Sequence, residues 1–229
     1  MPAFNGYPVE TLEFLHELEV NNNRAWWDEN KARYEAVVRE PSLDFITSMG
    51  PEIAKISEHF SAVPKKVGGS MMRPHRDVRF SKDKTPFKTN IGIQFRHEQA
   101  KDVHAPGFYL HIDNTGCFLA AGCWRPEPGA LKKIRARIHE RPKDWQKARD
   151  ARGFKNLYVL GGSSLKRPPR GYRADDAMIE DLMRKDFVGS TEFSAADIEK
   201  RDFLKQCSGA FKKAAPLMGF LCAALEVPF

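Results

Sequence analysis

Hydrophobic residues recur at helical spacing through residues 1–60. Leucines three positions apart open the pattern, and Asn23 is a typical N-cap for a second helix over 24–38. A proline precedes a third helix, which is expected over 42–49. Gly50-Pro51 then predicts a stop or a kink before another short helical stretch. This part of the chain is therefore predicted to be mostly helical.

From residue 89 the pattern changes to alternation. Apolar and polar side chains alternate over 90–96 and again over 108–113, which is the period of a β-strand. The turn sequence Asp113-Asn114-Thr115-Gly116 then leads into a nearly continuous apolar run over 117–124. Such a run favours a strand covered on both faces. Three consecutive strands predict an antiparallel meander.

Helical spacing returns after residue 128. Apolar residues between 131 and 138 lie on one face, with lysines and arginines between them, so this segment is expected to be a basic amphipathic helix. Further helices are expected over 144–152 and 174–185. A loop rich in glycine and proline separates them at 161–172.

The C-terminal region is expected to hold a short edge strand over 188–193 and a final helix. Ser194 and Asp197 have the spacing of a capping box that opens this helix. Pro216 should end or kink it, because proline cannot donate the helical hydrogen bond.

These elements predict an α+β fold in a single domain over residues 1–229. A central antiparallel β-meander would be packed by N-terminal and C-terminal helices. The domain would be helical over 1–60, would hold a basic loop and the meander over 65–125, and would be helical over 128–225. The sequence shows no internal repeat, low-complexity tract or linker that would divide it.

Composition indicates a cytoplasmic protein. A chain of 229 residues can bury a core without disulfides or metal. Its four cysteines lie among apolar neighbours without C-x-x-C spacing, so they are expected to be core residues in a reducing compartment. The N-terminus has no basic region typical of a signal peptide, and no apolar run approaches the roughly 20 residues of a membrane span. No membrane partner is expected.

Positive charge is concentrated between Arg73 and Lys88. The net charge of the chain is +7, which favours anionic partners. This one segment carries six cations against Asp77 and Asp83, an excess of +4. The six cations are Arg73, Arg76, Arg79, Lys82, Lys84 and Lys88. Arginine grips phosphate or carboxylate with a planar fork and lysine adds a point charge, so the segment is a candidate anion site.

The same segment resembles the DUF2461 family. The chain matches the pattern of that family at Arg73, Arg76, Asp77, Arg79, Phe80, Asp83 and Lys84. Phe87 stands where the family pattern has tyrosine, so a hydroxyl role is lost there while a packing role remains. The resemblance extends to the segments 22–27, 122–126 and 168–172. It implies a bacterial protein of about this size without an assigned activity.

Two interpretations of the basic segment stay open. It can bind a small molecule that carries a phosphate or a carboxylate, through Arg76, Arg79, Lys84 and Lys88, with Arg73, Asp77 and Asp83 ordering the site. Arg125 and Arg170 are further candidate ligand-binding residues, and the loop around Arg170 could close as a lid. Alternatively the segment is a structural ion-pair network, in which Asp77 bridges Arg76 and Arg79 while Asp83 bridges the lysines.

Candidate catalytic residues are few. The polar face of the meander either faces water or lines a pocket roofed by the basic segment. In the second case His111 and Tyr109 are the expected acid–base residues, with Asp77 as a further candidate. His97, His104 and His111 lack a compact zinc spacing, so no metal site is predicted. The sequence contains no phosphate loop, G-x-S-x-G or H-E-x-x-H, and neither reaction type nor cofactor is predicted.

Other classes of function remain alternatives. A nucleic-acid-binding module could combine the basic segment with the helix from Lys132 to Arg141 and the Arg170 loop, and its binding would weaken steeply with salt. A protein-interaction subunit is a third class. Trp26 and Trp27 could stack on bases, although core packing is the more common role of adjacent helical tryptophans. The oligomeric state is not predicted.

Overall fold

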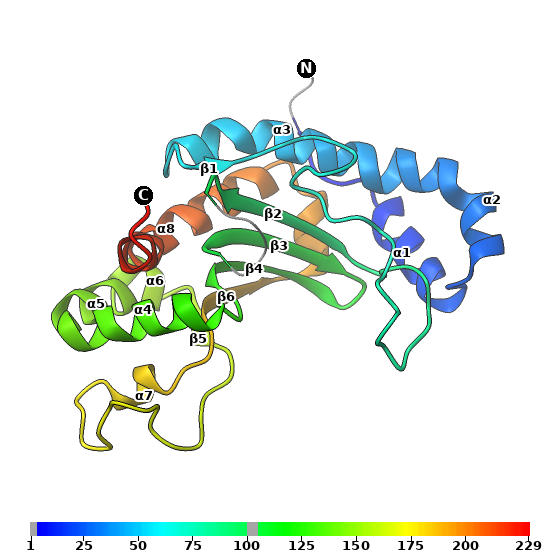
Figure 1. Ribbon diagram of the computed structural model, residues 1–229. Helices are drawn as coiled ribbons and strands as arrows, with labels where there is room; N and C mark the ends of the chain where they lie inside the picture. The colour runs from blue at the N-terminus through cyan, green and yellow to red at the C-terminus, as the bar shows by residue number, and fades with distance from the viewer. Residues whose placement is uncertain (1–3, 100–104) are drawn as a thin grey trace.

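The computed structural model describes residues 4–99 and 105–229. Its centre is a six-stranded antiparallel sheet in the order β1-β2-β3-β4-β6-β5 (Figure 1). Strands β2 to β4 form the predicted meander, in which Leu110 stands opposite Ile93 on one side and Leu119 on the other. The strands are β1 (Phe60–Ser61), β2 (Ile91–His97), β3 (Gly107–Asp113), β4 (Gly116–Cys123), β5 (Val159–Gly161) and β6 (Phe187–Phe193).

One face of this sheet is buried under helices. Helix α8 (Phe203–Ala224) packs against β4, and α3 (Glu40–Ala54) packs against both α8 and β2. Alternate strand residues point into this layer and are almost completely buried, because strand side chains alternate between the two faces. They include Ile91, Ile93, Phe95, Phe108, Leu110, Ile112, Leu119 and Phe187. The architecture confirms the predicted single-domain α+β fold.

The N-terminal helices are connected with fewer interruptions than predicted. Helices α1 (Glu10–Val20) and α2 (Arg24–Tyr34) lie where they were expected, and the Asn23 side chain caps α2 by accepting from the backbone N–H of Trp26 at 3.0 Å. A π-helical turn, η1 (Glu35–Arg39), then joins α2 to α3 without a loop. Helix α3 continues through Gly50-Pro51, so of the two expected outcomes, a stop or a kink, the stop is wrong.

The C-terminal half differs from the prediction in several places. Helices α4 (Pro128–Glu140), α5 (Pro142–Arg149) and α6 (Arg152–Lys155) follow the meander, but 174–185 holds only the single turn α7 (Ile179–Leu182). The Ser194–Asp197 capping box opens a short 3-10 turn, η2 (Ala195–Glu199), and α8 begins later. Helix α8 continues through Pro216, so the helix does not end there. Strand β6 is interior, since β5 pairs with its outer side.

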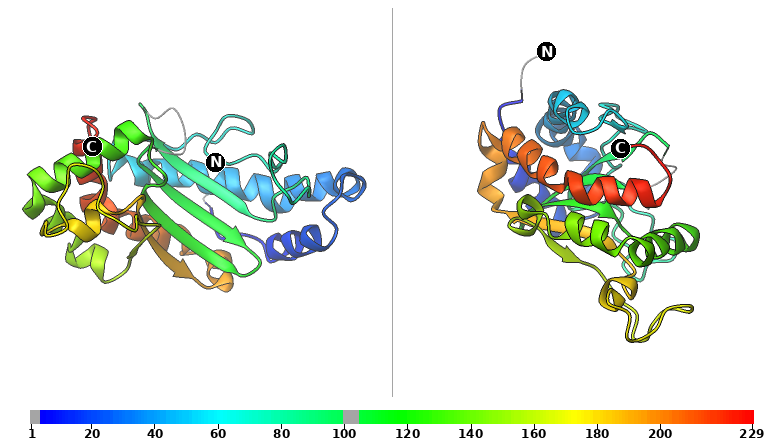
Figure 2. Two further views of the ribbon diagram at one scale, coloured as in Figure 1. Left: turned by 60° about the horizontal axis from the view of Figure 1, so that its bottom comes forward. Right: turned by 90° about the vertical axis from the view of Figure 1, so that its left-hand side faces the viewer.

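The opposite face of the sheet has no described helix over it. Figure 2 shows this face between two projecting segments of the chain. Beyond β2 projects an irregular hairpin over residues 73–88, here called the finger, and at the other end lies the long connection between β5 and β6 that carries α7. Strand β4 has no described helix over this face, but residues 119–123, which point alternately to both faces, are all buried.

Two composition-based expectations can be compared with the structure. All four cysteines, Cys117, Cys123, Cys207 and Cys222, are buried in the core as predicted. Within the described residues, none of the helices has the length and apolar character needed to cross a membrane.

Candidate functional site

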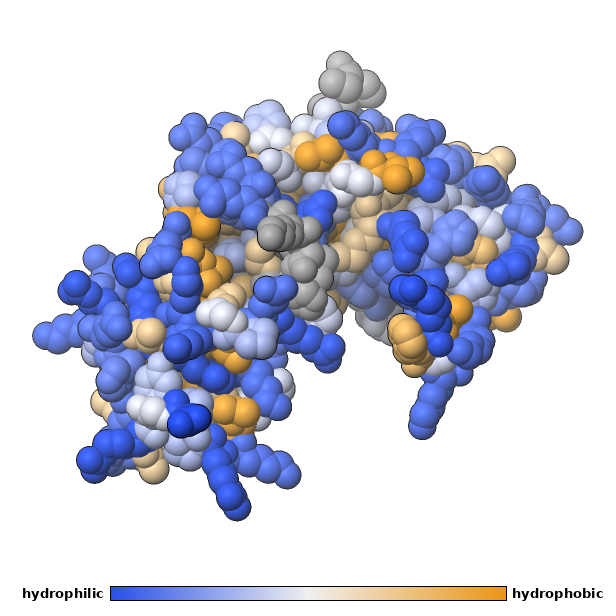
Figure 3. Space-filling view, in the orientation of Figure 1, coloured by the Kyte–Doolittle hydropathy of each residue, from blue (hydrophilic) through white to orange (hydrophobic). Residues whose placement is uncertain are grey.

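A groove of about 480 Å³ lies on the uncovered face of the sheet. Figure 3 shows the molecule hollowed between the lobe that carries the finger and the lobe that carries α4 and α7. Four neighbouring strands and their ends supply the walls of this sheet groove. The lining includes Met72, Gln94, Tyr109, His111, Phe118, Ala120, Trp124 and Ser190. Part of the polar meander face, Gln94, Tyr109 and His111, thus lines a groove, whereas no residue of the finger belongs to its lining.

Strand periodicity explains why these side chains share one face. Tyr109 and His111 are two residues apart on β3, and His111 stands opposite Gly92 on β2 and Phe118 on β4. The imidazole ring of His111 stacks on Phe118 with the ring centroids 4.6 Å apart. A Cβ atom at position 92 would lie 2.9 Å from the Tyr109 hydroxyl, so a larger residue there would displace the Tyr109 side chain.

Tyr109, His111 and Asp113 form a continuous hydrogen-bonded chain along β3. The Tyr109 hydroxyl lies 3.1 Å from His111 Nδ1, and His111 Nε2 lies 3.0 Å from Asp113 Oδ2. The side-chain amide of Asn90, on the neighbouring segment, approaches the same Nδ1 at 3.4 Å. Residues spaced two apart on one strand thus place a phenol, an imidazole and a carboxylate in sequence, the arrangement that proton transfer needs.

The carboxylate at the end of this chain is held as an anion. Oδ1 of Asp113 accepts hydrogen bonds from the Thr115 N–H at 2.8 Å, the Thr115 hydroxyl at 2.7 Å and the Gly116 N–H at 3.2 Å. Burial acts to raise the pKa of Asp113, but the hydrogen bonds from Thr115 and His111 outweigh it and the pKa lies below its ordinary value. Burial raises the pKa of Tyr109 to about 12, so its phenol is protonated at neutral pH.

The finger is anchored at its base by backbone pairing. The N–H of Met72 donates to Gly92 O at 2.8 Å, which extends the sheet beyond β2. Lys88 N–H donates to Pro74 O at 2.7 Å, and Phe87 pairs with His75 across the finger. The Phe87 ring is buried and stacks on Trp27 at 4.2 Å. The packing roles expected for Phe87 and for Trp27 are therefore confirmed.

Most charges at the tip of the finger neutralise one another. Asp77 accepts from Arg79 at 2.7 and 2.9 Å, and Asp83 pairs with Arg76 rather than with the lysines. Hydrogen bonds from Arg79 lower the pKa of Asp77 to about 2, and those from Thr85 and Arg76 lower the pKa of Asp83 to about 2. Both carboxylates are therefore ionised at neutral pH, and both arginines are occupied.

Lys84 is also engaged within the finger. Its ammonium donates to the Val78 carbonyl at 2.9 Å. The predicted network therefore exists, but its pairing differs from the prediction, because the Asp83 side chain faces across the hairpin towards Arg76 instead of along the chain.

Two cations, Arg73 and Lys88, lie at the base of the finger, and like Lys82 and Lys84 they form no ion pair within the described residues. Within the described residues, neither Arg73 nor Lys88 has an acidic side chain at ion-pair distance. Lys88 is partly buried, and burial together with the neighbouring charge of Arg73 lowers its pKa. Arg73 directly follows Met72, which lines the groove, and Lys88 precedes Asn90, which contacts His111. Two cations that repel each other thus lie on segments that lead into the groove, although neither belongs to its lining.

The two remaining predicted ligand residues, Arg125 and Arg170, lie away from the finger. Arg125 follows Trp124 at the opposite end of the groove, its guanidinium 4.7 Å above the Trp124 ring. Its backbone N–H donates to the buried carboxylate of Asp186 at 2.8 Å. Arg170 lies in the exposed connection between β5 and β6, across the hollow from the finger. One small ligand is therefore not expected to contact both Arg170 and Arg73.

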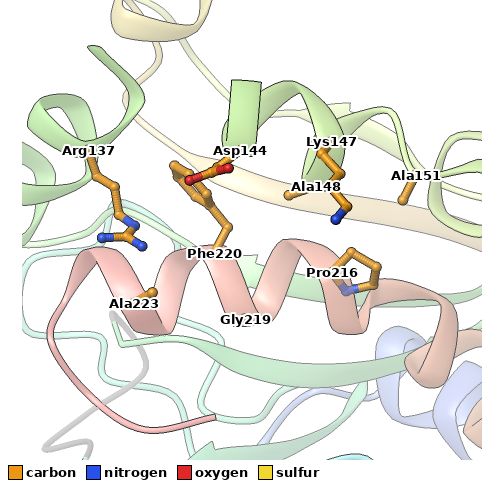
Figure 4. A pocket seen from close by; sticks show the side chains of 9 residues that line it. All are labelled: Arg137, Asp144, Lys147, Ala148, Ala151, Pro216, Gly219, Phe220 and Ala223. Carbon is orange, nitrogen blue, oxygen red and sulfur yellow. The ribbon is translucent and has the colours of Figure 1, made fainter. Parts of the chain in front are cut away.

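A second depression lies between α5 and α8. Its floor is made of small or apolar residues, and its charged groups, Arg137, Asp144 and Lys147, stand around it (Figure 4). The Arg137 guanidinium lies 5.8 Å from the centre of the Phe220 ring. This depression has no histidine or tyrosine, so it offers less acid–base chemistry than the sheet groove.

No metal site is found in the described part of the chain. No group of three or more histidine, cysteine, aspartate or glutamate side chains there could hold an ion. His97 is buried and bonds Pro228 O at 2.9 Å, while His104 lies outside the described residues. The expectation that the protein has no metal site stays a prediction.

Comparison with known proteins establishes the family. The model of the family described as "Conserved hypothetical protein (DUF2461)" matches residues 10–220. The chain belongs to the DUF2461 family. No curated protein and no solved structure shows a significant match to it. The DUF2461 match covers the finger, the meander and the sheet groove together, so the candidate site lies within the family domain.

Proposed function

We propose that this DUF2461 protein binds a small molecule with a phosphate or carboxylate group and an apolar body. The apolar body would lie in the sheet groove, against Phe118 and Ala120, while Arg73 and Lys88 hold the anion. The observation that carries the proposal is a pair of neighbouring cations, with no described acidic side chain at ion-pair distance, on segments that continue into the lining of a largely apolar groove. An anion would relieve their repulsion and supply the missing counter-charge.

In this proposal, Arg73 and Lys88 are the only cations of the finger that contact the ligand. Arg76 and Arg79 already hold Asp83 and Asp77, and those pairs order the finger instead of binding. Arg73 and Lys88 belong to the two strands of the finger that pair at its base. The stacking of Phe87 on Trp27 fixes that base against α2, so the two cations are held in place before a ligand arrives.

Calorimetric titration with phenyl phosphate tests the proposal, because this probe joins a phosphate to an apolar ring. A hydrogen bond to a charged group contributes roughly 1.5–3 kcal/mol, so loss of both cations should weaken binding by at least about 100-fold. The test variant is Arg73→Gln/Lys88→Gln. The matched control is Arg79→Gln, which removes an arginine of the same finger that is paired with Asp77, and its affinity should equal that of the wild type.

Equal affinity of the double variant and the wild type would reject Arg73 and Lys88 as the anion site. An equal loss in Arg79→Gln would show a diffuse electrostatic effect of the finger. Melting temperatures of all three proteins should be recorded first, so that a folding defect is not taken for a binding defect.

Single-stranded nucleic acid is the second candidate, because the open sheet face carries Tyr109 and Phe118 with Trp124 at its end. Bases can stack on aromatic side chains of a sheet. Against it, α4 lies across the hollow from the finger, and its Lys133 and Arg135 are engaged by Glu226 and by the Arg184 carbonyl. Titration with short oligonucleotides at low and physiological salt separates the two, since only nucleic-acid binding should fall steeply with salt.

A further inference from the structure

We propose that Tyr109 and His111 form a proton relay that removes a proton from a compound bound in the sheet groove, with Asp113 positioning His111. This inference deepens the proposed function, because it assigns chemistry to the floor of the same groove. It makes the protein an acid–base enzyme, and its substrate class is a phosphate or carboxylate compound with a removable proton near the anionic group.

The hydrogen bonds of His111 determine where its proton lies. Asp113 is an anion that can only accept, so His111 Nε2, 3.0 Å away, must carry the ring proton. In the neutral ring Nδ1 is then the acceptor, and it receives the hydroxyl proton of Tyr109 across 3.1 Å. The direction of every bond in the chain follows from the charge of Asp113. The imidazole is therefore ready to take a proton from Tyr109.

Tyr109 is the member of the chain that meets the ligand. Both ring nitrogens of His111 are engaged, Nδ1 by Tyr109 and Asn90 and Nε2 by Asp113. The Tyr109 side chain lines the groove, and its oxygen still has lone pairs after donating its proton. Tyr109 is therefore the candidate catalytic residue and Asp113 a positioning residue.

The proton transfer balances without any co-reactant. The Tyr109 oxygen accepts the proton of the substrate while the hydroxyl proton of Tyr109 moves to His111 Nδ1. Tyr109 stays neutral overall, His111 becomes an imidazolium beside the Asp113 carboxylate, and the electron pair of the broken bond stays on the substrate. Arg73 and Lys88 would stabilise that developing negative charge. Reversal of the same steps returns the proton to the product.

The Kemp elimination of 5-nitrobenzisoxazole tests the relay directly. This neutral aromatic probe needs only a base: its C3–H proton is removed, its N–O bond breaks, and a coloured nitrile phenolate forms. General acid–base catalysis contributes roughly 10²–10⁴-fold, so Tyr109→Phe should lower kcat/KM by at least about 100-fold. The matched control is Tyr172→Phe, because Tyr172 also lies beside a histidine that pairs with an aspartate, His139 with Asp176, but outside the groove.

Wild-type turnover no faster than that of Tyr109→Phe would overturn the relay. The control, Tyr172→Phe, should match the wild type, and an equal loss there would also contradict the proposal. Because the probe is neutral, this result is separate from the anion test. If phenyl phosphate bound but 5-nitrobenzisoxazole were not turned over, the relay alone would be rejected. If 5-nitrobenzisoxazole were turned over but phenyl phosphate did not bind, the anion site alone would be rejected.

Nitrogen-15 spectra of histidine-labelled protein supply a second, independent test. The relay requires His111 to carry its proton on Nε2 at neutral pH, and a ring protonated on Nδ1 would overturn it. Asp113→Asn should switch the tautomer. The Thr115 and Gly116 donors keep the amide oxygen at the Oδ1 position, so the amide nitrogen faces Nε2 and the ring proton moves to Nδ1. A purely structural role of Asp113 would leave the tautomer unchanged.

Discussion

Replacing Asp181 with alanine is expected to lower the free energy of unfolding by about 3–5 kcal/mol. Asp181 is a buried carboxylate near the start of the segment that leads back into β6. It accepts from Trp145 Nε1 at 2.7 Å, from Arg149 and, at 2.9 Å, from Arg184 Nε. Its removal leaves a fully buried indole N–H without an acceptor and deprives the partly buried guanidinium of Arg184 of its ion-pair partner, while Arg149 keeps its pair with Asp150.

Thermal and urea unfolding measure this effect. A domain of this size loses roughly 2–4 °C per kcal/mol, so the melting temperature should fall by on the order of 10 °C. Asp175→Ala is the control, because Asp175 forms a fully exposed pair with Arg173 on the same connection. Similar melting temperatures for Asp181→Ala and the wild type would contradict a supporting role for this cluster.

Phe87→Ala is expected to cost about 3–5 kcal/mol as well, and in addition to weaken anion binding. The Phe87 ring is 3% exposed and stacks on Trp27, while its backbone exchanges hydrogen bonds of 2.9 and 3.0 Å with the side chain of Asn22. Truncation leaves a cavity between the finger and α2. Arg73 and Lys88 then lose the rigid base that holds them together.

The finger itself supplies the control for this variant. Phe80 lies at its tip and is 95% exposed, so Phe80→Ala should leave both the melting temperature and the phenyl phosphate affinity unchanged. Urea unfolding and calorimetry on the two variants measure the two effects separately. If Phe87→Ala lost stability but kept full affinity, Arg73 and Lys88 would not depend on the base of the finger.

Periodicity was enough to predict the layers of the fold. The alternation over 90–96 and 108–113 is strong because one strand face is buried under α3 and α8, and those strands were located correctly. Strands β1 and β5 were missed because they are only 2 and 3 residues long, too short for a period to show. The helix ends considered at Pro51 and Pro216 were wrong, because α3 and α8 continue through both prolines, while the alternative of a kink stays a prediction.

The candidate site was predicted in part. His111 and Tyr109 were identified by residue type and alternation, and the structure places both in the groove. Phe118 was missed because it belongs to an apolar run that does not alternate. Ser190 was missed because its strand was expected at the edge of the sheet, whereas it pairs with both β4 and β5. The sequence could not show that Arg76 and Arg79 pair with aspartates while Arg73 and Lys88 do not. Those pairs depend on how side chains meet across the finger, which spacing along the chain does not show.

The most direct measurement of the central claim is methyl NMR of protein labelled with [methyl-13C]methionine and titrated with phenyl phosphate. Met72 lines the sheet groove, whereas Met49 and Met218 are fully buried in α3 and α8 and serve as internal controls. Binding in the groove predicts a saturable shift of the Met72 methyl resonance while Met49 and Met218 stay in place, and loss of this shift in Arg73→Gln/Lys88→Gln. A saturable binding isotherm with no movement of Met72 would place the ligand elsewhere and contradict the account.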